Sequence, residues 1–142
     1  MQYLYPKQMN ISGSYESLTA EIIGAAFEVQ KLLGPGTLGL SYRTCLAHEL
    51  KLRGLIVVED FPIPIIYKGV GLEGGYRGDL LVENTVIVQV RAAPNFAPVH
   101  EAQLLSYLKL ANKRVGLLVN FHAVPLRTGI RRMANEYDRK SA

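Results

Sequence analysis

The sequence predicts an α/β domain in which a mixed β-sheet is flanked by helices. Apolar residues recur at spacings of three and four in two N-terminal segments and again near residue 100, which is typical of amphipathic helices. Segments of alternating or β-branched residues lie between them, and a nearly wholly apolar run, 115–121, follows the last helical segment. Helices and strands in this order favour one sheet with helices packed against it.

Two helices are expected at the start of the domain. The first covers 18–33 and ends at Gly34-Pro35-Gly36, because glycine suits a left-handed cap and proline cannot continue a helix. The second covers 38–53 and ends at Gly54. Residues 1–17 show no clear period and are expected to form an N-terminal arm.

Strands are expected next, over 55–58, 61–67, 76–83 and 86–92. Two prolines interrupt the second of these segments, which predicts a sheet edge because proline cannot donate to a strand ladder. The last two segments predict a hairpin.

A third helix is expected over 98–112, with Pro98 near its first turn. The apolar run 115–121 predicts a strand covered on both faces. The segment after Pro125 is open between a short helix and a strand. One domain is therefore expected over 18–135, with 136–142 as a basic C-terminal tail.

The composition excludes several classes of protein. The 142 residues are 49% hydrophobic, which is too apolar for a disordered chain. No apolar run approaches the roughly 18 residues that span a membrane, and the first residues do not resemble a signal peptide. A lone cysteine, Cys45, excludes an internal disulfide and a cysteine-rich zinc site. We therefore expect a cytoplasmic protein with no membrane partner.

The net charge of +4 is concentrated near the C-terminus. From Leu126 onward there are five basic residues and two acidic ones. Such a terminus is either solvated or a contact for phosphates.

Polar side chains of the predicted hairpin converge on one face of the sheet. If residues 83–85 form the turn, Asp79 lies opposite Gln89, and Arg91 shares the face of Gln89. On the following helix, a polar stripe runs beside the leucine face; it consists of His100, Gln103 and Tyr107. Taken alone, the hairpin face is either solvated or part of a site.

The order Asp-x9-Gln-x-Arg followed by Gln-x-x-x-Tyr resembles the PD-(D/E)XK nuclease superfamily, in particular its exonuclease branch marked by a Q-x-x-x-Y helix. Over about residues 18–135 the chain is similar to the small GxxExxY protein family, a member of that superfamily. The motifs that carry the resemblance are the segments 22–29, 33–36, 46–50, 67–69, 75–83 and 98–109. The resemblance implies a restriction-endonuclease-like core.

Active members of the superfamily hydrolyse phosphodiesters with Mg²⁺ or Mn²⁺. A hard cation needs anionic oxygen ligands, and the bound metal polarises the phosphate and activates the attacking water. The resemblance places the vestigial catalytic positions at Asp79, Gln89, Arg91 and Gly39.

The sequence departs from the family pattern at five positions. Gly39 stands where the glutamate of GxxExxY is expected, and Arg43 stands where an acidic residue follows the tyrosine. Gln30 replaces a histidine of the first helix. Gln89 and Arg91 replace the E-x-K pair.

Asp79 alone remains of the metal-site residues, and it is the metal ligand only if a metal binds. At 4–6 Å and an effective dielectric near 20, each contact between an arginine and a dication costs on the order of several kcal/mol. Arginine stays protonated and cannot act as a base. We therefore expect no cofactor, with Mg²⁺ or Mn²⁺ required only by an active enzyme.

Three functions remain open. The favoured one is a catalytically inactive protein that binds DNA or RNA through a cationic pocket of Arg43, Arg91, His100, Gln103 and Tyr107. The second is an active nuclease whose ligands have moved to Glu21, Glu28, Glu83 or Glu101. The third is a non-enzymatic interaction module that self-associates through the edge strand 61–67 or the N-terminal arm.

Overall fold

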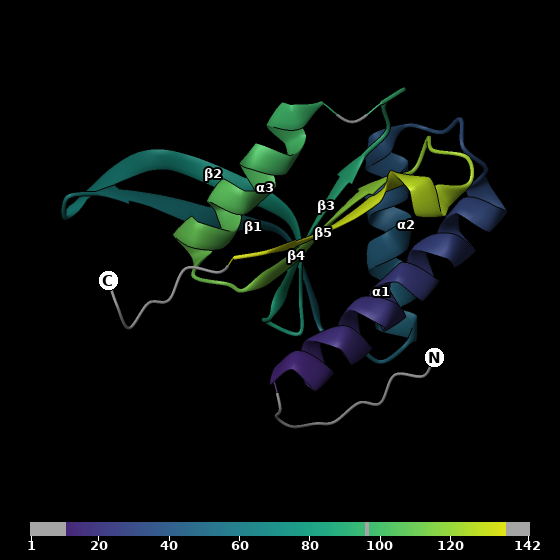
Figure 1. Ribbon diagram of the computed structural model, residues 1–142, viewed down its shortest axis with the longest axis horizontal. Helices are drawn as coiled ribbons and strands as arrows, with labels where there is room; N and C mark the ends of the chain where they lie inside the picture. Colours follow the sequence, from purple (N-terminus) through teal and green to yellow (C-terminus); the bar gives the residue numbers. More distant parts are fainter. Residues whose placement is uncertain (1–10, 96, 136–142) are drawn as a thin grey trace.

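The chain folds into a five-stranded sheet between two helical layers (Figure 1). The computed structural model describes residues 11–95 and 97–135. Its elements are α1 (Ile11–Leu33), α2 (Gly39–Leu52), β1 (Val57–Tyr67), β2 (Val70–Val82), β3 (Val86–Arg91), α3 (Pro98–Ala111), β4 (Val115–Asn120), the 3-10 turn η1 (Leu126–Gly129) and β5 (Ile130–Ala134).

The sheet is mixed, as the sequence predicts. Its strands are ordered β1-β2-β3-β4-β5, and every neighbouring pair is antiparallel except β3 and β4. A parallel pair needs a crossover connection, and α3 supplies it. Helices α1 and α2 lie on one side of the sheet and α3 lies on the other (Figure 1).

The largest differences from the predicted boundaries are in α1, β1 and β2. Helix α1 begins at Ile11, so the predicted arm over 1–17 is too long, and its residues 1–10 lie outside the described part. Strand β1 is one continuous strand: Asp60 takes a positive φ of 53°, yet the residues on either side of it, Glu59 and Phe61, both pair with β2 in one register. Strand β2 begins at Val70, directly after a turn in which Lys68 and Gly69 both have positive φ, and not at Tyr76.

The C-terminal segment combines both predicted alternatives. The 3-10 turn η1 is followed by β5, which pairs antiparallel with β4. Three of the arginines assigned to the basic end, Arg127, Arg131 and Arg132, therefore belong to the folded domain. The predicted tail 136–142 lies outside the described residues.

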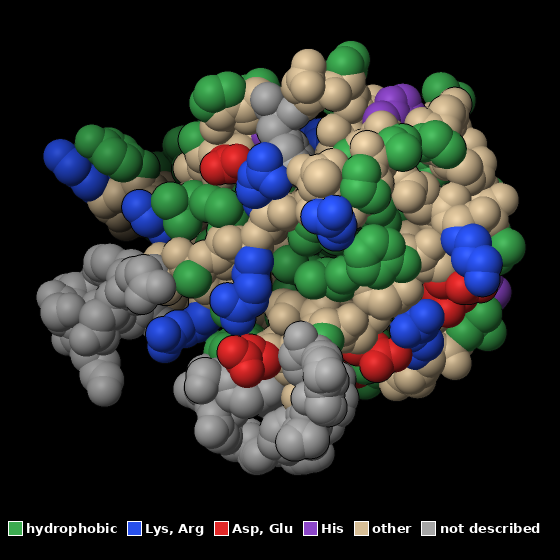
Figure 2. Space-filling model, turned by 45° about the vertical axis from the view of Figure 1, so that its right-hand side comes forward, with side chains coloured by type: hydrophobic (Ala, Val, Ile, Leu, Met, Phe, Trp, Pro, Cys, Tyr) green, Lys and Arg blue, Asp and Glu red, His purple; other side chains and the backbone are tan. Residues whose placement is uncertain are grey.

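The β1–β2 hairpin forms an arm that extends beyond α3 (Figure 1). Pro62 and Pro64 lie on β1, which is an edge strand as predicted. Figure 2 shows Lys and Arg side chains spread among apolar and acidic ones on one face of the molecule. On that face, positive charge is therefore not gathered into one continuous patch.

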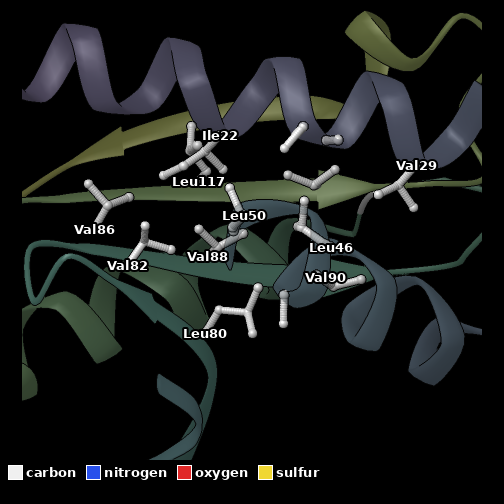
Figure 3. Close-up of a cluster of buried hydrophobic side chains, with 14 of the residues drawn as sticks. Ile22, Val29, Leu46, Leu50, Leu80, Val82, Val86, Val88, Val90 and Leu117 are labelled. Carbon is white, nitrogen blue, oxygen red and sulfur yellow. The ribbon is translucent and has the colours of Figure 1, made fainter. Parts of the chain in front are cut away.

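The larger core lies between the sheet and the α1–α2 layer. Figure 3 shows side chains from both helices, among them Ile22, Val29, Leu46 and Leu50, facing side chains of the strands, among them Val82, Val88 and Leu117. Each fully buried aliphatic side chain of this kind contributes about 1.5–3 kcal/mol. A smaller core beneath α3 contains Phe61, Ile63, Ile87, Leu104, Leu108 and Leu118.

Strand β4 is buried along its whole length, as its apolar run predicts. Successive side chains of a strand point to opposite faces, so Leu117 enters the larger core and Leu118 the smaller one. Among the described residues, none of the helices combines the length and apolar character required to cross a bilayer.

Candidate functional site

The site begins where β2 and β3 separate. Backbone pairing between these strands runs from Val82↔Val86 to Leu80↔Val88, and residue 79 is next in this register. Beyond that point side chains take over the hydrogen bonding: the Asp79 N–H donates to Gln89 Oε1 at 2.8 Å, and the Val90 N–H donates to Asp79 Oδ2 at 2.7 Å. The sequence prediction that Asp79 and Gln89 face each other is confirmed.

Arg91, the last residue of β3, joins this pair to α3. One guanidinium nitrogen lies 3.5 Å from Asp79 Oδ2 and donates to the Val90 carbonyl at 2.7 Å. The other nitrogen donates to Gln103 Oε1 of α3 at 2.6 Å. The Arg91 side chain is thereby held in one orientation.

Arg43 approaches the same carboxylate from α2, with a guanidinium nitrogen 3.6 Å from Asp79 Oδ1. Its Nε is buried and has no hydrogen-bond partner within the described part of the chain. Gly39 lies one turn earlier on α2, and a Cβ built on it would lie 3.7 Å from the Cβ of Ala92. The start of α2 therefore lies beside the end of β3.

The charges of this cluster are one carboxylate and two guanidinium groups. The side chains of Asp79, Arg43 and Arg91 are only 20–25% exposed, so solvent weakens their mutual attraction less than at an open surface. With Asp79 ionised, the cluster carries a net charge of +1. We use the name arginine pocket for this group of five side chains, namely Arg43, Asp79, Gln89, Arg91 and Gln103.

The donor set does not fit Mg²⁺ or Mn²⁺, which take anionic or neutral oxygen ligands. The Asp79 carboxylate already accepts the Val90 N–H and faces two arginines. The Gln89 amide oxygen accepts the Asp79 N–H, and Gly39 offers no side-chain ligand. Among the described residues, three or more His, Cys, Asp or Glu side chains do not gather anywhere in a metal-binding arrangement.

The family model for the PD-(D/E)XK nuclease superfamily matches residues 16–133. The chain belongs to this superfamily. The mixed sheet with its flanking helices is accordingly a restriction-endonuclease-like core. No curated protein and no solved structure matches the chain. Membership of the GxxExxY family and of the Q-x-x-x-Y branch stays a prediction.

Three of the four glutamates considered as alternative metal ligands have partners outside the arginine pocket. Glu21 pairs with Arg53 at 3.1 Å on the α1–α2 surface. Glu83 accepts the Ile56 N–H at the far end of β2, and Glu101 lies 3.4 Å from an Arg131 nitrogen of β5.

The fourth glutamate considered, Glu28, lines an apolar groove of about 420 Å³ between α1 and α2.

The predicted polar stripe of α3 is divided among three roles. Gln103 alone reaches the arginine pocket. His100 accepts the Ala97 N–H at 3.2 Å through Nδ1 and so caps the start of its own helix. Tyr107 is buried against the ring of Tyr76, with ring centroids 5.3 Å apart.

Burial raises the pKa of the Tyr107 phenol, the nearby Arg91 charge lowers that pKa to a smaller extent, and Tyr76 and Asp79 raise it further. The Tyr107 ring lies one helical turn beyond Gln103 and so close to the arginine pocket. Tyr76 is not a predicted site residue, because its contact with α3 joins residues far apart in the sequence that no local pattern brings together.

Tyr42 and Gln30 make structural contacts and do not take part in the arginine pocket. Tyr42 accepts the Thr37 N–H at 2.9 Å, donates to the Gly34 carbonyl and stacks on Phe121 with centroids 4.5 Å apart. Gln30, which stands where a histidine is expected, donates to the carbonyls of Phe121 and Ala123. Both side chains tie the α1–α2 connection to the end of β4.

Proposed function

We propose that this superfamily member binds nucleic acid through the arginine pocket, without a metal and without cleaving it. The single observation that carries the proposal is the pairing of Asp79 with both Arg43 and Arg91. Where an active relative gathers carboxylates around a dication, this chain gathers guanidinium groups around its one carboxylate.

The pocket suits a phosphodiester. Guanidinium groups bind phosphate oxygens through two parallel N–H bonds and remain charged at every physiological pH. Asp79 and Gln103 hold Arg91 from two sides, so little side-chain entropy is lost when a phosphate binds. The net positive charge of the cluster supplies the attraction.

Metal-assisted hydrolysis is less well supported by the same contacts. It requires ligands for the cation and a group that accepts a proton or orders the attacking water. Arginine cannot accept a proton, and Asp79 is shared by three donors. We therefore propose that the chain is a pseudoenzyme of its superfamily.

The test is fluorescence anisotropy of labelled single- and double-stranded DNA and RNA in EDTA. Arg91→Ala and Arg43→Ala should each weaken binding about tenfold or more, since charge-assisted hydrogen bonds of this kind contribute about 1.5–3 kcal/mol. Lys51→Ala is the matched control: it removes one positive charge from α2 about two turns beyond Arg43, where the half-exposed Lys51 pairs with Glu59.

Unchanged affinity in both arginine variants would refute the pocket assignment. Cleavage in Mg²⁺ or Mn²⁺ that disappears in Asp79→Ala would instead establish the alternative of an active nuclease with relocated ligands.

A second candidate function is a non-enzymatic assembly module, favoured by the apolar side chains on the β1–β2 arm. Ile66, Tyr67 and Val70 at its tip are each at least 60% exposed, and β1 is an edge strand. Such an edge can pair with a second copy of the chain. Sedimentation velocity tests this candidate, and a monomer at every concentration would contradict it.

A further inference from the structure

A pair of tyrosines lies beside the arginine pocket. The rings of Tyr76 and Tyr107 are tilted by 32° with centroids 5.3 Å apart. Tyr107 is 6% exposed, whereas Tyr76 is 46% exposed. Tyr76 therefore covers the buried ring and presents aromatic surface to solvent.

Tyr76 directly follows an irregularity in the β1–β2 ladder, and its pairing with Ile63 continues the register that begins at Val57↔Val82. Ile63 pairs with Tyr76 and Ile65 pairs with Leu72, so residues 73–75 lie opposite the single residue Pro64. A Cβ built on Gly75 would lie 2.5 Å from the Ile63 carbonyl oxygen, so only glycine allows this close approach.

The tyrosine pair is connected to the arginine pocket through α3. Tyr107 follows Gln103 by one helical turn, and residues at this spacing have Cβ atoms about 5–6 Å apart. Gln103 accepts a hydrogen bond from Arg91 at 2.6 Å. Arg91, Gln103, Tyr107 and Tyr76 thus form a row that leads from the charged cluster, past the buried Tyr107, to the half-exposed ring of Tyr76.

We infer that the ligand of this row is single-stranded nucleic acid, with a phosphate on Arg43 and Arg91 and a neighbouring base stacked on Tyr76. The inference rests on the proposed function and names its substrate class. Bases in a duplex are stacked on one another, whereas an unpaired base offers its face to an aromatic side chain. A ring beside a phosphate pocket therefore selects unpaired strands.

The test compares three labelled probes in EDTA: a short oligothymidine, a duplex of equal length and an abasic strand of equal length. Tyr76→Ala should weaken binding of the oligothymidine about tenfold, since base stacking on an aromatic ring contributes about 1–3 kcal/mol. Binding of the duplex and of the abasic strand should not change. Tyr76→Phe keeps the ring and should bind like the wild type.

A control variant on the same arm is Tyr67→Ala, which removes an exposed tyrosine at the tip. It should leave the affinity for all three probes unchanged. An equal loss in Tyr67→Ala and Tyr76→Ala would overturn the specific placement of the base.

A second readout does not depend on affinity. The chain contains no tryptophan, so Tyr76→Trp introduces a single reporter at the stacking position. Its fluorescence should be quenched by the oligothymidine and not by the abasic strand. Equal responses to the two strands would contradict stacking.

The failures of the two proposals are distinguishable. If Arg91→Ala loses binding while Tyr76→Ala binds the oligothymidine like the wild type, the stacking inference is overturned and the phosphate pocket stands. If the wild type binds duplex and single strand equally, the strand preference is overturned. If binding does not depend on Arg91, both proposals fall.

Discussion

Asp79 illustrates how neighbouring residues decide what a carboxylate can do. In a metal-dependent nuclease an aspartate at this position would share a cation with other carboxylates. Here it accepts the Val90 N–H and balances Arg43 and Arg91. The same side chain thus becomes an orienting group for two cations.

The substitution Asp79→Asn distinguishes metal-free binding of nucleic acid from metal-dependent cleavage. It should strengthen the first and abolish the second. Asparagine keeps the shape and still accepts the Val90 N–H, but it removes the negative charge that competes with a phosphate. We expect metal-free affinity for an oligonucleotide to become roughly threefold to tenfold tighter. Anisotropy in EDTA measures this change, and weaker binding would contradict the charge argument.

Restoring the ligands expected from the GxxExxY pattern should restore metal binding. The variant Gly39→Glu, Arg43→Asp, Gln89→Glu, Arg91→Lys replaces two arginines and adds three carboxylates near Asp79. The side chain at position 39 has room, because its Cβ would make only ordinary contact with Ala92.

Mn²⁺ should raise the melting temperature of this variant by several degrees and leave the wild type unchanged, since a ligand stabilises the state that binds it. Differential scanning fluorimetry with and without Mn²⁺ measures the shift. An equal shift in the wild type would show that the natural site already holds metal.

At the residue scale, sequence reasoning located the pocket through strand alternation. The period of two and the turn at 83–85 place Asp79 opposite Gln89, and the structure confirms this. The role of His100 was not predictable from its place in the stripe. A helix N-terminus leaves backbone N–H groups without partners, and a histidine at the third position can accept one.

Among the elements, the α1–α2 connection determines the position of Arg43 relative to Asp79. Tyr42 and Gln30 fasten this connection to the end of β4, through Phe121 and Ala123. Because Arg43 follows Tyr42 directly, the anchored ring sets the position from which the arginine approaches Asp79.

Tyr42→Phe should destabilise the fold by about 1–3 kcal/mol, because the Thr37 N–H and the Gly34 carbonyl each lose a partner. The ring stack on Phe121 is kept. Urea unfolding measures the change in the free energy of unfolding. The control Tyr67→Phe, at an exposed site, should leave it unchanged; equal stability of both variants would contradict the anchoring role.

Element boundaries were harder to predict than element types. The sequence predicts two segments, 55–58 and 61–67, where the structure has the one strand β1. In the structure Asp60 takes a positive φ and accepts hydrogen bonds from Arg77 on β2, which keep the two strands together. Such cross-strand compensation lies outside any local pattern.

On the scale of the whole molecule, the fold gathers residues from four elements at one point. Arg43 comes from α2, Asp79 from β2, Gln89 and Arg91 from β3, and Gln103 from α3. Both helical layers therefore contribute to the pocket, which lies where the sheet between them opens. The net charge of +4 supplies a weak general attraction, and the pocket supplies the position.

Binding should depend on salt as contact with one phosphate requires. For a single strand each neutralised phosphate contributes a slope of about −0.7 in the logarithm of the association constant against the logarithm of the salt concentration, so a slope near −0.7 is expected. Arg91→Ala should reduce its magnitude. Titrations between about 50 and 200 mM salt measure it, and an affinity independent of salt would exclude phosphate contacts.

The most direct test of metal-free binding is a titration of a labelled single-stranded oligonucleotide with the wild-type chain in EDTA. The titration is repeated in excess Mn²⁺, and the length of the recovered oligonucleotide is then checked. Equal affinity in the two buffers and an intact strand are expected, because Arg43 and Arg91 both pair with Asp79. Binding that appears only with Mn²⁺, or a shortened strand, would contradict the assignment of this pocket as a metal-free phosphate site.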